Sequence, residues 1–188
     1  WAITFKTPFT GVKNTYLYVK DDRGRYNGWV RKGTWTIVNQ GPSVGTVTPS
    51  SGSTYPDNEV FFETTYSDPD TCLNMAIVFF LISPSTAEWS KCFYAKYEQN
   101  TDKLYLKDDR YSNSWKGGYP PGSSYIITNN YVKLDCSQTT VSPVTGGETT
   151  LTINWAVTFM PTLTGVKKSY LKVKDDAGAI NGWTEKGD

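Results

Sequence analysis

The chain carries nearly the same segment at both of its ends. Residues 1–33 read WAITFKTPFTGVKNTYLYVKDDRGRYNGWVRKG, and residues 155–187 read WAVTFMPTLTGVKKSYLKVKDDAGAINGWTEKG. With one further residue included, 20 of the 34 aligned positions are identical without a gap. Self-similarity at a fixed offset is the signature of repeat architectures. We therefore expect the chain to span one repeat period of 154 residues and then to return to its own opening pattern.

Each copy of this segment predicts short strands joined by a hairpin. In WAITF, the side chains of Trp1, Ile3 and Phe5 alternate with smaller or polar ones and so share one face of a strand. In TYLYVK, Leu17 and Val19 alternate in the same way. The polar stretch DDRGRYNG predicts a turn, and the residues from Trp29 onward predict the returning strand.

The body between the copies favours strands over helices. Tyr, Trp and Thr are abundant, and short apolar segments are separated by turn signals roughly every 8–12 residues, which is typical of a β-sandwich. A Gly-, Pro- and Ser-rich stretch is typical of a module boundary. We predict an all-β chain with a terminal hairpin segment over residues 1–38, a linker over 39–58 and an immunoglobulin-like β-sandwich module over 59–188.

Three motifs carry a family resemblance. SVGTVTPSSGS, TYSDPD and NWAVTFMPTLTGVKKSYLKVKDDAGAINGW together resemble tandem immunoglobulin-like modules of large secreted bacterial surface proteins. The resemblance implies an immunoglobulin-like sandwich and an extracellular or cell-surface location. It also implies a structural or adhesive role, as a repeat unit of a fibre, tandem array or surface layer, and it implies no substrate.

The unfinished first copy predicts a partner. A sandwich needs both inner faces covered, yet residues 1–38 come without a body of their own. The segment either belongs to a preceding module of a tandem array or adds its strands to a neighbouring copy, head to tail. In both cases six side chains are predicted to form the assembly interface: Trp1, Ile3, Phe5, Leu17, Val19 and Trp29.

Composition argues against several functions. There are 19 Lys and Arg against 18 Asp and Glu, so charge gives no case for nucleic acid, and no apolar run approaches the ~18 residues of a membrane span. The chain has no histidine, which removes the commonest general base and metal ligand. We predict no catalytic residues and expect copies of the chain or adjacent repeats as partners, with no nucleic acid and no membrane insertion.

Cysteines and acidic pairs offer two further predictions. Cys92 and Cys136 each lie in a predicted strand, and a disulfide between them across the sandwich is favoured, which leaves Cys72 unpaired. Clustered carboxylates at strand ends suit a structural Ca²⁺, although Asp equally favours turns, and no other cofactor is expected. The candidate calcium ligands are Asp21, Asp22, Asp68, Asp70, Asp175 and Asp176.

Aromatic side chains give an alternative function. A flat platform of Tyr and Trp on one sheet face would stack against sugar rings, and this predicts a carbohydrate-binding or adhesion module with a polysaccharide partner. Cross-strand pairing and contact between copies also favour Tyr and Trp, so both interpretations stay open. The candidates are Tyr16, Tyr18, Tyr94, Tyr97, Tyr105, Tyr119, Tyr125, Tyr131, Trp29, Trp89 and Trp115.

Overall fold

The computed structural model describes residues 1–5, 9–142 and 147–188 and is built from antiparallel β-strands. The chain divides into two compact units, unit 1 over Trp1–Gln40 and unit 2 over Gly41–Asp188. Within the described residues the helices are two short 3₁₀ turns, η1 (Cys72–Asn74) and η2 (Gln99–Thr101), and neither could cross a membrane. The prediction of an all-β chain is confirmed.

Unit 1 is a two-stranded hairpin of β1 (Gly11–Lys20) and β2 (Tyr26–Ile37). Its turn is held by Asp21, whose carboxylate accepts hydrogen bonds from the backbone N–H groups of Arg23 (3.0 Å) and Arg25 (2.7 Å). Gly24 takes a positive φ of 82°, which glycine adopts without steric cost. The predicted strand over Trp1–Phe5 is absent, because these five residues pair with no neighbour and are exposed.

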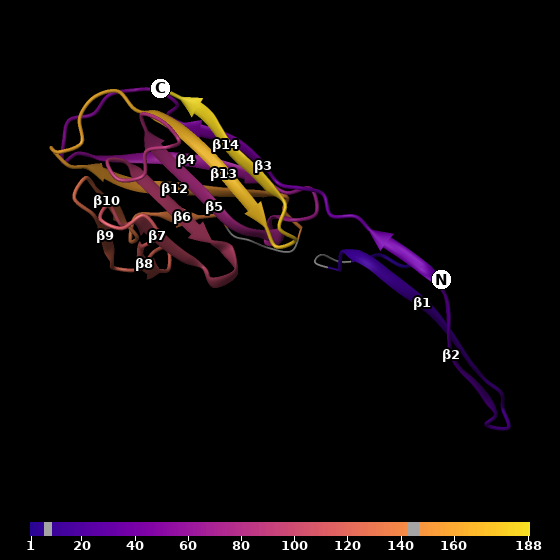
Figure 1. Ribbon diagram of the computed structural model, residues 1–188. Coiled ribbons are helices and arrows are strands. Elements are labelled where there is room, and N and C mark those ends of the chain that lie inside the picture. Colours follow the sequence, from indigo (N-terminus) through magenta and orange to yellow (C-terminus); the bar gives the residue numbers. More distant parts are fainter. Residues whose placement is uncertain (6–8, 143–146) are drawn as a thin grey trace. The chain divides into compact units, whose positions relative to one another are not determined.

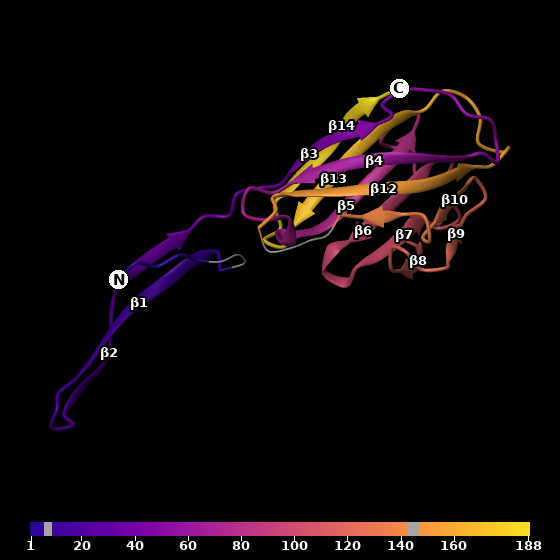
Figure 2. The same ribbon diagram turned by 180° about the vertical axis from the view of Figure 1, so that it is seen from behind.

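Unit 2 contains two six-stranded sheets that face each other, as Figure 1 and the reverse view in Figure 2 show. The first sheet has the order β3 (Ser43–Thr48), β4 (Glu59–Ser67), β12 (Thr150–Phe159), β10 (Val132–Asp135), β9 (Ile126–Thr128), with β11 (Thr140–Val141) paired to β12. The second has the order β14 (Ile180–Gly187), β13 (Lys168–Asp175), β5 (Met75–Ser83), β6 (Phe93–Glu98), β7 (Lys103–Lys107), β8 (Trp115–Tyr119).

Alternating side chains from both sheets make one shared core. In β6, Phe93, Ala95 and Tyr97 are buried against the first sheet while their neighbours point outward. Trp155 of β12 lies at the centre, with its ring centroid 6.2 Å from that of Phe80 and 6.3 Å from that of Phe93. This single core makes unit 2 a β-sandwich-like body.

Two buried hydrogen bonds fix the polar atoms of this core. The indole Nε1 of Trp155 donates to the Thr64 hydroxyl at 2.8 Å. The Tyr66 hydroxyl, from the first sheet, donates to the Phe79 carbonyl of the second sheet at 3.1 Å. A buried donor without an acceptor destabilises the folded state. These bonds therefore allow the Trp155 and Tyr66 side chains to be buried without leaving a donor unpaired.

The sheets also approach each other along the edge formed by β3 and β14. Lys186 Nζ donates to the Val44 carbonyl at 3.3 Å. A Cβ added to Gly187 would lie 1.8 Å from the Ser50 carbonyl oxygen, so only glycine fits the end of β14 there. A similar approach joins β8 to β9, where Lys116 Nζ donates to the Thr128 carbonyl at 3.1 Å.

The predicted linker over residues 39–58 is wrong in part, because residues 43–48 form β3 of the sandwich. Val47 is buried, and a register shift between Val44 and Val47 lets the strand lie close to β4. A Cβ on Gly45 would be 2.1 Å from the Thr65 hydroxyl oxygen. Gly45, one of the residues that gave the segment the composition of a linker, is thus required by the packing of β3 against β4.

The two copies of the repeated segment pair in the same register. Leu17 of β1 is opposite Val30 and Leu171 of β13 is opposite Thr184, which are equivalent positions. Both hairpins have register shifts at equivalent places. In the second copy the turn is again held by an aspartate, since Asp175 accepts the backbone N–H of Ala179 at 2.7 Å.

The copies differ in what covers them. Leu171 is 0% exposed because β13 lies between β14 and β5 under the first sheet, whereas Leu17 is 64% exposed. The six predicted interface residues Trp1, Ile3, Phe5, Leu17, Val19 and Trp29 are all exposed large hydrophobic side chains. Of their counterparts, Trp155, Val157, Leu171 and Val173 are fully buried, and Phe159 and Trp183 are partly buried.

This contrast predicts unequal effects for one substitution made at two equivalent positions. Leu171→Ala should lower the free energy of unfolding of unit 2 by about 2–5 kcal/mol, because it opens a cavity in the core. Leu17→Ala is the matched control and should change it by less than about 0.5 kcal/mol. Denaturant unfolding followed by circular dichroism measures both, and equal effects would contradict the burial described for the two hairpins.

Candidate functional site

The outward face of the second sheet in unit 2 collects aromatic and lysine side chains. Because side chains alternate along a strand, Phe79 of β5 and Tyr94 and Lys96 of β6 point away from the core that their neighbours fill. Lys107 ends β7, and Trp115 begins β8 after the polar loop between them. Antiparallel pairing of these four strands brings the five side chains to one place.

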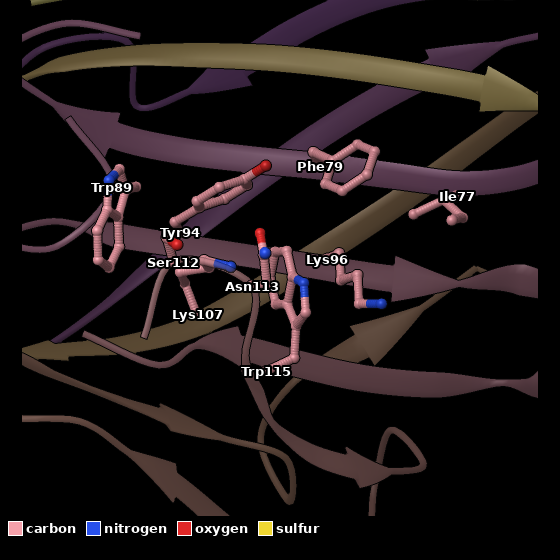
Figure 3. A pocket seen from close by; sticks show the side chains of 9 residues that line it. All are labelled: Ile77, Phe79, Trp89, Tyr94, Lys96, Lys107, Ser112, Asn113 and Trp115. Carbon is pink, nitrogen blue, oxygen red and sulfur yellow. The ribbon is translucent and has the colours of Figure 1, made fainter. Parts of the chain in front are cut away.

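These side chains line an open pocket of about 400 Å³, shown in Figure 3. The Tyr94 and Trp115 rings meet edge to face, with centroids 4.9 Å apart and planes at 73°. Trp183 of β14 extends the cluster, with its centroid 5.4 Å from that of Tyr94. The full lining is Ile77, Phe79, Trp89, Tyr94, Lys96, Lys107, Ser112, Asn113 and Trp115.

Lys96 is neutralised within the sheet. Its ammonium lies 4.4 Å from the Tyr105 ring centroid and 4.8 Å from that of Trp115, and it forms an ion pair with Glu98. Burial by itself raises the pKa of Glu98, but the hydrogen bond and charge of Lys96 hold that pKa below its ordinary value. The pair therefore contributes little net charge to the pocket.

Lys107 is in a different position. The residue is 5% exposed, and its ammonium lies over the Trp115 ring at 4.7 Å from the centroid. The part of the chain that the structure describes offers this ammonium neither a hydrogen-bond acceptor nor an ion-pair partner. The carboxylate of neighbouring Asp108 is engaged by Arg110 instead, at 3.3 Å. Burial, with the charge of Lys96 adding to it, lowers the pKa of Lys107, and the charge of Asp108 opposes this shift.

The predicted aromatic platform is divided among several places. Tyr94, Trp89 and Trp115 line the pocket, and Tyr105 lies beside it under Lys96. Tyr97 is buried in the core, where its hydroxyl donates to Asp102 at 2.8 Å. The others lie elsewhere: Tyr16, Tyr18 and Trp29 in the unit 1 hairpin, Tyr119 and Tyr125 in a stacked pair, and Tyr131 against the core.

The sequence did not point to Phe79, Trp183 and Lys107 as members of this cluster. The alternation in KCFYAKYE could have placed Tyr94 and Lys96 on one face. Phe79 joins them because β5 pairs with the next strand, β6, and Trp183 joins them only because β13, which carries β14 with it, pairs with the distant β5.

The predicted Cys92–Cys136 disulfide is wrong, because all three cysteines are free and buried. Cys136 belongs to the core between the sheets, whereas Cys92 packs with Leu81 and Tyr170 in a separate cluster. Cys92 precedes Phe93, which points into the core, so alternation turns its thiol toward the opposite face. Burial raises the pKa of Cys92 to about 12 and that of Cys136 to about 11.

The candidate calcium ligands have backbone and side-chain partners. Asp68 is fully buried, accepts from Asp70 N–H at 2.9 Å and from Asn74 Nδ2 at 3.3 Å, and burial raises its pKa. Asp176 accepts from Asn100 Nδ2 at 2.6 Å. Asp21 and Asp175 organise the two equivalent turns, and Asp22 lies in the first. Among the described residues no group of three potential metal-ligating side chains is found.

The arrangement is suited to binding. Flat rings at a steep angle, the Lys107 ammonium and the exposed polar side chains of Ser112 and Asn113 can hold a ring-shaped polar ligand. A scan against models of protein families found no match, and searches for similar curated proteins and for similar solved structures found none either.

The state of the cysteines predicts both a thiol count and a pH dependence. We expect a thiol reagent to leave the native protein unmodified and to find three thiols after denaturation. Because the native pKa of Cys92 is about 12 and that of an unfolded thiol about 8.5, the native state binds more protons between these values.

Stability should therefore be unaffected by Cys92 below about pH 8.5 and then fall by about 1.4 kcal/mol per pH unit up to about pH 12. Denaturant unfolding across this pH range measures the effect, and in the control Cys92→Ala the slope should be smaller by the Cys92 contribution while that of Cys136 remains. Detection of only one thiol after denaturation would contradict the free cysteines and show that the other two form a disulfide.

Proposed function

We propose that the chain is an extracellular structural protein, a repeat unit with immunoglobulin-like sandwich modules that builds a tandem array, fibre or surface layer. The observation that carries the proposal is the repeated hairpin. Both copies pair in the same register, but only the copy in unit 2 is buried against other strands. The exposed Leu17 and Val19 of unit 1 correspond to Leu171 and Val173, which are buried in unit 2 between β5 at the strand edge and the first sheet. A sandwich body of the same kind is therefore the natural partner of the unit 1 hairpin.

Two equivalent glycines support this interpretation. Gly187 is needed because Ser50 lies against the end of β14. Gly33 has the same place in β2, yet the nearest atom to a Cβ added there is the Thr15 hydroxyl oxygen at an ordinary 3.6 Å. Unit 1 alone gives no steric reason for this glycine, whereas a body that packs on the hairpin as in unit 2 would give one.

The equivalent positions also specify how such a body would pair with the hairpin. Leu171 and Val173 lie opposite Phe80 and Val78 of β5. By the same offset, Leu17 and Val19 would lie opposite the Phe80 and Val78 positions of the covering body. Addition of β1 to that edge would supply main-chain hydrogen bonds, and the alternating side chains would fix the register.

The proposal can be tested by completing the array. An extended chain with residues 41–154 added directly before Trp1 gives the first hairpin a sandwich body. The order is the same as in unit 2, where these residues precede Trp155. In this extended chain Leu17→Ala should cost about 2–5 kcal/mol, as Leu171→Ala does, because Leu17 becomes a core residue. Denaturant unfolding of the extended and the 188-residue chains, each with and without the substitution, gives the comparison.

Leu17→Ala would stay neutral in the extended chain if the hairpin were an ordinary appendage, and the proposal would then fail. Sedimentation of the 188-residue chain over a range of concentrations distinguishes the two modes of assembly. Head-to-tail strand addition gives masses that grow with concentration, since such contacts do not close, whereas a monomer at all concentrations favours modules joined within one longer chain.

A second function, carbohydrate binding, is favoured by the pocket on the outer face of unit 2. Its Trp115 and Tyr94 rings are presented on strands of the sheet, and rigid aromatic walls suit the apolar faces of sugars. We expect the chain to be retained on an insoluble polysaccharide and Trp115→Ala to reduce retention at least about tenfold, a loss of about 1.4 kcal/mol. Trp35→Ala, an exposed tryptophan in β2 of unit 1, is the matched control.

A further inference from the structure

Lys107 is 5% exposed as a whole residue, and its ammonium reaches the pocket, where no residue that the structure describes forms an ion pair with it. An ionised amine removed from water is costly unless it is paired, and lysine is rarely found so deeply buried without a partner. The Trp115 ring lies beneath the ammonium and offsets part of this cost. A ring face is a weaker partner than a carboxylate, so the site retains the capacity to bind an anion.

The surroundings of Lys107 leave a net positive charge at the pocket. Lys96 is paired with Glu98, and Asp108 is engaged by Arg110. Lys172 of β13 lies over Phe79 and Trp183, at 5.4 and 5.8 Å from their ring centroids, on the same face. Three lysine ammonium groups, those of Lys96, Lys107 and Lys172, thus lie over aromatic rings of this face, while the chain as a whole has a formal net charge of only +1.

The shape of the pocket limits the ligand. Its volume of about 400 Å³ is that of a small-molecule site, and the Tyr94 and Trp115 rings stand at 73° to each other. The apolar face of a saturated sugar ring can lie against Trp115 while its edge meets Tyr94. Ser112 and Asn113, from the loop before β8, offer hydroxyl and amide groups at the rim.

We propose that this pocket binds an acidic sugar, a hexuronate unit of a polysaccharide, with its carboxylate on the Lys107 ammonium and its ring against Trp115. The inference rests on the carbohydrate-binding candidate above and makes it specific. The carboxylate supplies the counter-charge that Lys107 lacks, and the ring hydroxyls meet Ser112 and Asn113. A neutral hexose would fill the same space but would give the Lys107 ammonium no ion-pair partner.

The test compares two ligands that differ only in charge. Calorimetric titration of the full chain with an oligogalacturonate is set against the same oligomer after reduction of its carboxyl groups to alcohols. We expect the acidic oligomer to bind at least about tenfold more tightly and its affinity to fall with added salt. Equal affinities for the two oligomers would overturn the acidic specificity and leave carbohydrate binding standing. No binding of either oligomer would overturn the proposal and count against the carbohydrate-binding candidate as well.

Substitution of the lysine gives a second measurement. Lys107→Met keeps the length of the side chain and removes the charge, and it should weaken binding of the oligogalacturonate about tenfold while leaving the reduced oligomer unaffected. Lys133→Met, on β10 of the other sheet, is the matched control and should bind as the unsubstituted chain does. Thermal unfolding verifies that both variants fold. Unchanged binding by a folded Lys107→Met variant would contradict the proposal, and if the variant fails to fold the ligand comparison decides alone.

Discussion

The burial of Trp155 is the contact on which unit 2 depends. Its indole packs against Phe80 and Phe93 from the opposite sheet and donates its one hydrogen bond to Thr64. In unit 2 the two sheets provide a surface on each side of this large side chain. The equivalent residue in the first copy, Trp1, has neither sheet and is fully exposed. The same residue type therefore forms a core in one copy and is left at the surface in the other.

The sequence alone was sufficient for the features that depend on local pattern. The duplicated ends and the period of two predicted the all-β class and the paired strands of each hairpin. The sequence alone was insufficient for features that depend on contacts between residues far apart in the chain. Residues 43–48 have the composition of a linker, yet they form a strand because Gly45 lets β3 lie against Thr65. Cys92 and Cys136 each follow a plausible strand pattern, but the faces toward which they turn depend on how the sheets stack.

The pocket illustrates the same limit. Tyr94 and Trp115 were candidates from the sequence, and alternation could have placed Lys96 beside Tyr94, but Phe79 and Trp183 join them through strand order. The depth of Lys107 depends on this order too, because Trp115 covers it only when β8 pairs with β7. A charge that composition would assign to solvent is thus held against an indole ring. Local sequence identifies candidate ligand-binding side chains, and the sheet order decides which of them meet.

Two of the sequence differences between the copies face each other across the hairpin. In unit 2 Lys168 forms an ion pair with Glu185 at 2.8 Å, and in unit 1 the equivalent residues are Asn14 and Arg31, joined by a hydrogen bond of 2.9 Å. A mixed hairpin of β13 with β2 would place Lys168 beside Arg31, and one of β1 with β14 would leave Glu185 beside Asn14 without a cation. The residues at these two facing positions thus match within each hairpin and would not match between the hairpins.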